Sequence, residues 1–374
     1  MHAAPPFAVE RLRKAAWSAL TLTMFLAFVE ILCRRVGAPD EQKYIQMDFD
    51  GDLMWGLGNG PGERPEYPVN SLGLRGDELA SVGTPGGGKS ARILTLGDSS
   101  IYGHGVATAE VFGAVVAARV SAARGAGGQD AGGVEAVNGG VPGYSTFQSL
   151  GLLARLAPIV HPDVVIVGNL WSDACRAAIT DRAWAAELAG AYGPWQPIVA
   201  PLALLTDHSA LARRLRKTVH DRVSPGKGKA NEIGWSHLFV PEPGQAPPAK
   251  GGMEALSLSR VPLDEYVANL HALAASTRAA GGLPAFLLLP HPIDAEQGVG
   301  PVERSYRDAL RSVAAAEHAP LIDGAAWFAA HPTDAPRFSD DIHPNTLGHA
   351  ELATAVLEAF AADDAIAARL GIGR

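Results

Sequence analysis

The segment Ile93–Ser99 is the feature that most constrains how this chain can fold. Its apolar residues, Ile93 to Leu96, predict a buried β-strand that ends abruptly at Gly97 and Asp98. The turn would place the hydroxyl of Ser99 at the carboxyl edge of a sheet, where open α/β folds bind their ligands. Ser99 is therefore a candidate nucleophile in a parallel α/β domain.

Short apolar runs alternate with alanine-rich segments from residue 91 onward. Strands are predicted at 91–97, 134–138, 164–168, 284–289 and 319–322. Helices are predicted at 108–124, 146–157, 263–280, 302–317 and 346–361. Such alternation is typical of a parallel sheet that is covered by helices on both faces.

A histidine with a nearby carboxylate occurs late in the chain, where Asp340 precedes His343 by three residues. A general base and an acid that orients it are the partners that a nucleophilic serine needs. The adjacent Asp341 precedes His343 by two residues and is interpreted as an exposed acid. Ser99, Asp340 and His343 together make up the parts of a serine acyl-transfer site.

Two other strand exits carry groups that suit such a site. The glycine-rich segment Asn138–Gly143 follows the second strand, and it lets backbone amides approach a ligand closely, as an oxyanion hole requires. An ordinary tight turn would explain the same glycines. The third strand is followed by Asn169–Asp173, which brings side-chain hydrogen-bond donors to its end.

These four ordered blocks resemble the SGNH (GDSL-type) hydrolase family over residues 91 to 361. The upstream segment Asn70–Gly76 is similar to one that precedes the domain in membrane-anchored bacterial members. The resemblance implies a flavodoxin-like three-layer α/β/α sandwich with a five-stranded parallel sheet. It also implies serine-dependent ester hydrolysis or acyl transfer without a cofactor.

The resemblance also assigns roles to individual residues. Ser99 would be the nucleophile, and its own backbone amide would be one oxyanion donor. Gly143 would supply the second oxyanion amide. His343 would be the general base, and Asp340 the acid that orients it.

The chain departs from the family in the third block, where Ser172-Asp173 replaces the usual Asn-Asp pair. We expect the Ser172 hydroxyl to replace the missing amide donor; Asn169 would do so if the loop were rearranged. Trp171 would either line the cleft or pack in the core.

Two histidines are further candidates for the pocket because each follows the end of a predicted strand. They are His104 and His291. The twelve histidines of the chain form no H-x-x-x-H or H-E-x-x-H pair, so no metal site is predicted.

The N-terminus contains an apolar run, Ala15–Cys33, that is long enough to cross a membrane. No small-x-small cleavage site follows it, which favours a retained anchor over a removed signal peptide. Glu30 is costly inside a span, and the alternative is an amphipathic or buried helix of the soluble body. A small excess of basic residues before the run favours a cytoplasmic N-terminus and a body in the periplasm or at the cell exterior. Together with the resemblance to membrane-anchored bacterial members, this predicts a single-pass protein of the bacterial inner membrane with a periplasmic or extracytoplasmic body.

The predicted organisation has three parts. Residues 1–35 would form the membrane anchor, 36–90 a linker or leading region, and 91–374 the hydrolase-like domain. Trp55 and Tyr67 would anchor the leading region by packing. Residues 176–260 interrupt the alternation and are interpreted as an insertion or lid.

Several other functions are disfavoured. The net charge of −8 provides no basic patch for nucleic acid, and two cysteines cannot form a disulfide framework. Residues 83–90 match the P-loop pattern but come before the first strand of the domain, so they are interpreted as a glycine-rich linker. The expected substrate is a small-molecule, glycan or lipid ester, and the alternative is a catalytically degenerate binding or scaffold protein.

Overall fold

The structure is a computed structural model. It describes residues 6–35, 47–57, 67–80, 90–126, 132–177, 179–192, 211, 258–291 and 300–372. The chain separates into two compact units, of which one contains the N-terminal helix and the other contains the sheet.

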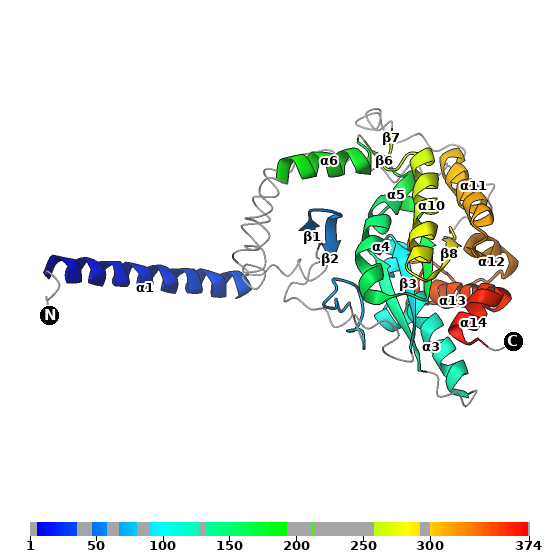
Figure 1. Cartoon of the computed structure of the whole chain (residues 1–374), viewed down its shortest axis with the longest axis horizontal. Coiled ribbons are helices and arrows are strands. Elements are labelled where there is room, and N and C mark those ends of the chain that lie inside the picture. Colours follow the sequence, from blue (N-terminus) through cyan, green and yellow to red (C-terminus); the bar gives the residue numbers. More distant parts are fainter. Residues whose placement is uncertain are drawn as a thin grey trace. The chain divides into compact units, whose positions relative to one another are not determined.

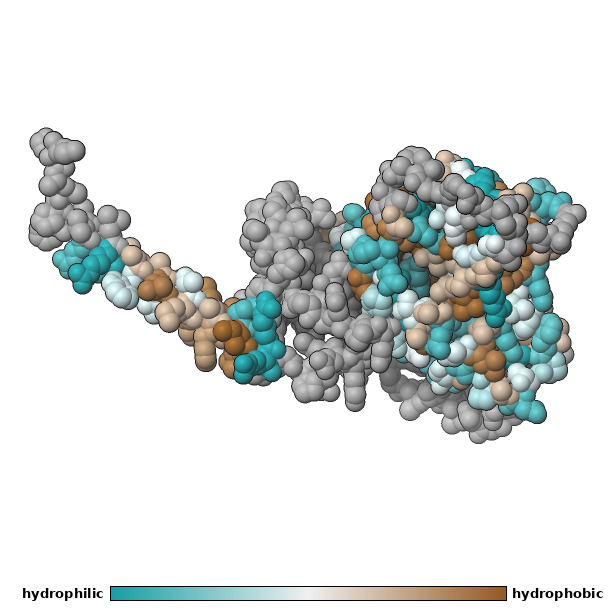
Figure 2. Space-filling model, turned by 90° about the horizontal axis from the view of Figure 1, so that it is seen from below, coloured by the Kyte–Doolittle hydropathy of each residue, from teal (hydrophilic) through white to brown (hydrophobic). Residues whose placement is uncertain are grey.

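The N-terminal unit contains a long helix, α1 (Pro6–Arg35). Its portion Arg13–Arg35 is long and apolar enough to cross a membrane, and it contains an 18-residue window with a mean hydropathy of 1.8. Apolar side chains follow its length between hydrophilic ends, as Figure 2 shows. The hydroxyls of Thr21 and Thr23 donate back to the carbonyls of Trp17 and Ala19, so neither is left unsatisfied in an apolar surrounding.

The acid inside the predicted span is paired. Glu30 accepts a hydrogen bond from Nε of Arg34 at 2.7 Å, one helical turn further on. Its second carboxylate oxygen accepts the backbone N–H of Leu211 at 2.9 Å. Pairing near the end of the helix lowers the cost of placing this acid close to a membrane interface.

The second unit is built on a five-stranded sheet whose strands follow the order β4-β3-β5-β8-β9. The strands are β3 (Ala91–Gly97), β4 (Val134–Gly140), β5 (Val164–Gly168), β8 (Leu283–Leu288) and β9 (Leu321–Asp323). All neighbouring pairs are parallel, and every residue of β3 and β5 is buried. The predicted five-stranded parallel sheet is confirmed, with shifts of a few residues at the strand ends.

Helices cover both faces of this sheet (Figure 1). One layer contains α3 (Phe112–Ala126) and α13 (Thr346–Ala362), which pack on each other. The other contains α4 (Thr146–Val160), α10 (Leu263–Ala279) and α11 (Pro301–Ala316). The result is the predicted three-layer α/β/α architecture.

Shorter elements complete the unit. They are α2 (Ser99–Tyr102), the 3₁₀ turn η1 (Thr108–Glu110), α5 (Trp171–Ala174), α6 (Asp181–Tyr192), α12 (Gly324–Ala330) and α14 (Asp364–Leu370).

The leading region belongs to the same compact unit as the sheet from Met47 to Asn59 and again from Glu63. It begins with an antiparallel hairpin, β1 (Met47–Asp50) and β2 (Met54–Leu57). The guanidinium of Arg75 lies over the rings of both Tyr67 and Tyr102, at 4.6 and 4.7 Å. Tyr67 therefore packs on the unit that contains the sheet, as expected. The domain boundary at residue 91 stays a prediction.

The predicted insertion leaves and re-enters the body at one place. Its ends pair as two short antiparallel strands, β6 (Arg176–Ala177) and β7 (Leu258–Ser259). Most of the segment between them, together with residues 83–89 of the P-loop-like sequence, lies outside the described residues. The lid interpretation and the linker interpretation therefore both stay predictions.

Candidate active site

The short helix α2 places Ser99 directly after the buried strand β3. Asp98 caps this helix by accepting the N–H of Ser100 at 3.0 Å. The helix packs closely on the neighbouring strand end, because a Cβ added at Gly140 would lie 2.3 Å from the backbone nitrogen of Tyr102. Glycine at the end of β4 thus allows the serine to sit at the edge of the sheet.

A chain of hydrogen bonds joins Ser99 to the two distant residues predicted to act with it. Nε2 of His343 lies 2.7 Å from Oγ of Ser99, and Nδ1 of His343 lies 2.7 Å from Oδ2 of Asp340. These distances suit a nucleophile, a base and an orienting acid. The fold therefore brings together three residues that are separated by up to 244 positions in the sequence.

The loop that carries His343 is fixed by local hydrogen bonds and by close packing. The N–H of Ser339 donates to the carbonyl of His343 at 2.9 Å, and the side chain of Asn345 caps α13 by accepting the N–H of Gly348. A Cβ at Gly348 would lie 2.3 Å from the carbonyl oxygen of Arg337, so the packing of this loop requires glycine there. This contact explains why Asn345 and Gly348 follow the histidine in the sequence.

Asp340 is held for its role by local hydrogen bonds. Its Oδ1 accepts the backbone N–H groups of Ile342 and His343 at 3.0 and 2.9 Å. Burial raises the pKa of Asp340, but these bonds and its contacts with the His343 ring outweigh burial, so the pKa lies below its usual value. Asp340 is thus a carboxylate at neutral pH. Asp341 is exposed, as expected.

Two backbone amides are free to receive an oxyanion. Within the described residues, neither the N–H of Ser99 nor that of Gly143 has a hydrogen-bond acceptor. Both follow neighbouring parallel strands that are in register at Gly97 and Gly140, so both lie at the same edge of the sheet. Gly143 adopts a φ of +80°, a conformation that favours glycine.

The two candidates for a third oxyanion donor have other partners. The Ser172 hydroxyl lies 3.5 Å from Oδ2 of Asp98, a long and weak hydrogen bond. The Asn169 side-chain amide donates to the carbonyl of Tyr144 at 3.3 Å. Both Ser172 and Asn169 are fully buried.

Asp98 is a buried acid that directly precedes Ser99. Burial raises the pKa of Asp98 to about 6, against hydrogen bonds from Ser100 and Ser172 and the positive charge that His343 gains when protonated. No role was predicted for Asp98 from the sequence, and the Gly-Asp-Ser motif does not indicate that its pKa is shifted.

The three candidate pocket residues differ in position. His104 is exposed and its ring lies 4.7 Å from that of His343, centroid to centroid. Trp171 is fully buried, which places it in the core. His291 is also buried and lies against Trp171, with ring centroids 5.5 Å apart. Of these three residues, His104 is the one whose ring contacts that of His343.

Sequence reasoning missed a buried ion pair beside the site. Arg260 and Asp181 are each 2% exposed and are joined by two hydrogen bonds of 2.9 Å. Arg260 also donates to the carbonyl of Gly143 at 2.7 Å. No local motif marks either residue, because the pair links the two ends of the insertion across 79 positions.

A second buried arginine was also missed, although it lies in the recognised Asn70–Gly76 segment. Arg75 donates to the carbonyls of Tyr102, Gly103 and Val106, at 2.7, 2.6 and 2.5 Å. It therefore fixes the loop that carries His104.

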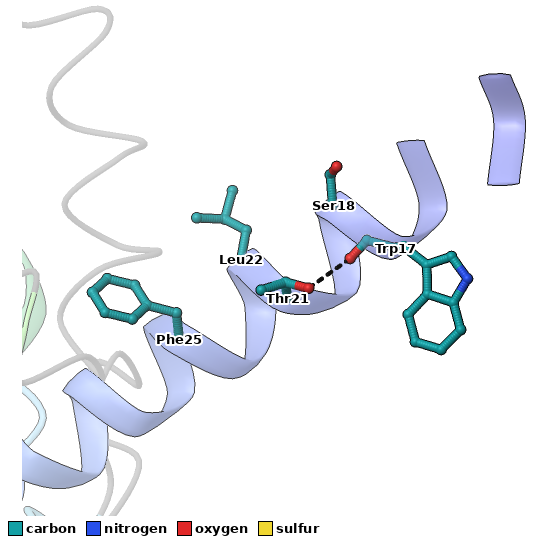
Figure 3. A pocket seen from close by; sticks show the side chains of 5 residues that line it. All are labelled: Trp17, Ser18, Thr21, Leu22 and Phe25. Carbon is teal, nitrogen blue, oxygen red and sulfur yellow. Dashed lines mark hydrogen bonds between the residues drawn. The ribbon is translucent and has the colours of Figure 1, made fainter. Parts of the chain in front are cut away.

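No group of three or more His, Cys, Asp or Glu side chains is arranged to hold a metal ion among the described residues. The pocket shown in Figure 3 lies on α1 and is lined by Trp17, Ser18, Thr21, Leu22 and Phe25. None of the candidate active-site residues lines it.

The unit built on the five-stranded parallel sheet carries the hydrogen-bonded residues Ser99, His343 and Asp340. Residues 240–351 match the model of the GDSL-like Lipase/Acylhydrolase family, and this match includes Asp340 and His343 but not Ser99. This match supports the predicted resemblance to the SGNH (GDSL-type) hydrolase family over that part of the chain. No curated protein sequence gives a significant match.

Solved structures with a similar fold include several esterases. TesA is 15% identical, with 72% of this chain and 97% of that chain covered and a TM-score of 0.40. The acetylxylan esterase Axe2 of Geobacillus stearothermophilus is 18% identical, with 72% and 93% covered and a TM-score of 0.40. The psychrotrophic esterase EstA of Pseudoalteromonas sp. is 14% identical, with 72% and 97% covered and a TM-score of 0.40.

Proposed function

We propose that the protein is a serine-dependent ester hydrolase or acyltransferase that works through an acyl-enzyme on Ser99. The observation that carries this proposal is the chain of two 2.7 Å contacts from Ser99 through His343 to Asp340. A serine in such contact with a base is activated for attack on an ester carbonyl.

In the proposed reaction, His343 takes the proton of the Ser99 hydroxyl as the oxygen attacks the carbonyl carbon. Asp340 holds the imidazole in the tautomer that leaves Nε2 free to accept that proton. The His343 proton then passes to the leaving alcohol as the ester bond breaks. The acyl group is thereby transferred to Ser99 and the alcohol departs.

The tetrahedral oxyanion is stabilised by the amides of Ser99 and Gly143. We assign the third donor to Ser172, because its bond to Asp98 is long enough to be exchanged for a stronger one to an oxyanion. Asn169 is the alternative, and it would have to give up its bond to Tyr144.

The acyl-enzyme is released either to water, which makes the protein an esterase, or to a sugar hydroxyl, which makes it an acyltransferase. Both outcomes use the same triad. We propose an acylated carbohydrate or lipid of the cell envelope as the substrate class, because α1 is long and apolar enough to hold the domain at a membrane. The proposed location is the bacterial inner membrane, with a single span and the catalytic domain on the periplasmic side.

The competing proposal is a membrane-tethered binding or scaffold protein with a degenerate site. The replacement of the family asparagine by Ser172 favours it. The hydrogen-bonded arrangement of Ser99, His343 and Asp340 argues against it, since a binding surface has no need of an aligned base.

The test is hydrolysis of 4-nitrophenyl esters of increasing acyl length by the full-length protein in detergent, with and without added oligosaccharide. Turnover that disappears in Ser99→Ala supports the enzyme. Alcohol release that outpaces free acid formation when sugar is present identifies transfer. A folded wild-type protein that turns over none of the esters favours the binding protein.

A further inference from the structure

The Gly143 amide is held by side chains that take no part in the proposed reaction. Gly143 itself lies in a turn, with a φ of +80° and a hydrogen bond from the N–H of Tyr144 to the carbonyl of Val141 at 2.9 Å. A turn of this kind can rotate its peptide planes at low cost unless other groups fix them. Hydrogen bonds from two side chains fix the carbonyl of Pro142 and the carbonyl of Gly143 itself.

The first contact comes from the leading hairpin. The indole Nε1–H of Trp55 donates to the carbonyl of Pro142 at 3.1 Å. The peptide between Pro142 and Gly143 is trans, so its C=O and N–H point in opposite directions. The indole therefore directs the Gly143 N–H away from Trp55.

The same indole also limits movement of the turn by contact. A Cβ added at Gly143 would lie 3.3 Å from Cζ2 of Trp55, so the ring packs directly against this residue. Trp55 is fixed in turn by Tyr144, whose hydroxyl donates to the Trp55 carbonyl at 2.5 Å. The β1–β2 hairpin and the turn at Gly143 therefore stabilise each other's position.

The second contact comes from the end of the insertion. Arg260 donates to the carbonyl of Gly143 at 2.7 Å, which fixes the following peptide plane. The other hydrogen bonds of the Arg260 guanidinium go to both carboxylate oxygens of Asp181. Asp181 also accepts the hydroxyl of Ser145 at 2.6 Å, and Ser145 caps α4 immediately after the turn.

We propose that Trp55 and Arg260 are positioning residues that orient the Gly143 amide as an oxyanion donor. This inference rests on the proposed function. It adds that activity depends on the β1–β2 hairpin, which carries Trp55, and on Arg260, which directly follows β7. The orientation of this backbone amide matters because the two candidate side-chain donors, Ser172 and Asn169, must each give up a hydrogen bond before they can reach an oxyanion.

The test compares two tryptophans of one cluster in the full-length protein. Trp55→Phe removes the N–H that holds Pro142 and keeps an aromatic ring. Trp184→Phe is the matched control, because Trp184 packs on Trp55 at 5.6 Å and its buried indole N–H has no hydrogen-bond partner in the described structure. The readouts are kcat and KM for a 4-nitrophenyl ester, the pH dependence of kcat/KM, and the melting temperature.

We expect Trp55→Phe to lower kcat between about tenfold and 100-fold, because a displacement of the donor by even 1 Å has effects of this size. KM and the pH profile should not change, since the oxyanion forms only in the transition state and the triad is intact. Trp184→Phe should stay within about twofold of the wild type. Arg260→Lys, which cannot reach Asp181 and Gly143 together, should show the same selective loss of kcat and supports the inference if Trp55→Phe fails to fold.

If the wild type is active, three results would overturn the inference. The first is a Trp55→Phe enzyme with wild-type kcat. The second is an equal loss in Trp184→Phe. The third is a loss that appears only in KM or follows the melting temperature. A wild-type protein that reacts with neither ester nor fluorophosphonate overturns the proposed function, and this inference with it; an active wild type with an unaffected Trp55→Phe overturns this inference alone.

Discussion

The imidazole of His104 lies against that of His343, with ring centroids 4.7 Å apart and ring planes inclined by 42°. The N–H of His104 donates to the carbonyl of Ser99 at 3.0 Å, so the loop that begins behind the nucleophile returns to the base. Burial, and then the charge that His343 gains on protonation, lower the pKa of His104. His104 is therefore a neutral ring beside the base at neutral pH.

Replacing His104 tests whether this ring contact orients the base. His104→Ala should lower kcat/KM between about twofold and tenfold, the range that a lost aromatic contact provides. His104→Phe preserves the contact and should retain most of the activity. Steady-state kinetics at pH 8 provides the measurement. Equal activities in the two variants would show that stacking has no role.

The neighbouring acids Asp340 and Asp341 provide a matched pair. Asp340→Asn keeps an oxygen for the N–H groups of Ile342 and His343 but loses the charge that orients the imidazole. We expect kcat to fall by about 10²- to 10⁴-fold, the upper value being that of a buried triad acid. Asp341→Asn removes the same charge from an exposed neighbour and should stay within about twofold of the wild type, because a carboxylate in water without a hydrogen bond to His343 interacts weakly with that ring. A similar loss in both variants would exclude a specific role for Asp340.

Ser172→Ala tests the proposed third oxyanion donor. If the Ser172 hydroxyl turns from Asp98 to the oxyanion, its removal should lower kcat by about tenfold or more without raising KM. Turnover of individual 4-nitrophenyl esters gives both constants. Unchanged kcat in a folded Ser172→Ala enzyme would rule out this assignment and leave Asn169 as the candidate.

The stability of the fold in acid should depend on His349. This buried residue accepts the N–H of Phe112 at 3.3 Å, and burial lowers its pKa from 6.5 to about 3. Between pH 3 and pH 6.5 the unfolded chain therefore binds a proton on His349 that the folded chain does not bind. The contribution of this residue to stability is full above pH 6.5 and is lost as the pH falls toward 3. His349→Gln keeps an acceptor but cannot be protonated.

Urea unfolding at pH 7.5 and pH 4.5 measures this effect. Between these pH values the wild type should lose about 2 to 3 kcal/mol more free energy of unfolding than His349→Gln, from about 1.4 kcal/mol per pH unit in the window. Buried His291, whose pKa is lowered to about 4, is present in both proteins and does not contribute to the difference. An identical acid sensitivity in the two proteins would contradict the assignment.

Much of the architecture could be predicted because it depends on local patterns. The β-branched run Val164–Val167 predicts a buried strand from its residues alone, and the Gly-Asp-Ser turn marks where a strand must end. The spacing of Asp340 and His343 is likewise local. Their meeting with Ser99 was implied by the resemblance to the SGNH family, because Asp340 and His343 lie in a loop that does not directly follow a strand.

The supporting contacts could not be predicted because they join residues far apart in the sequence. Trp55 was expected to pack, but its hydrogen bond to Pro142 spans 87 positions. Arg260 reaches Gly143 across 117 positions. The same holds for Ser172, whose long contact with Asp98 depends on how two loops meet. No sequence period encodes such contacts.

The most direct test of the central claim is whether Ser99 is an activated nucleophile. The full-length protein in detergent is treated with a fluorophosphonate, and the adduct is counted by intact mass and located by peptide mass spectrometry. We predict a single adduct on Ser99 that is absent from Ser99→Ala and forms slowly in Asp340→Asn. An adduct that persists in folded Ser99→Ala, or no adduct on the folded wild type, would contradict the account.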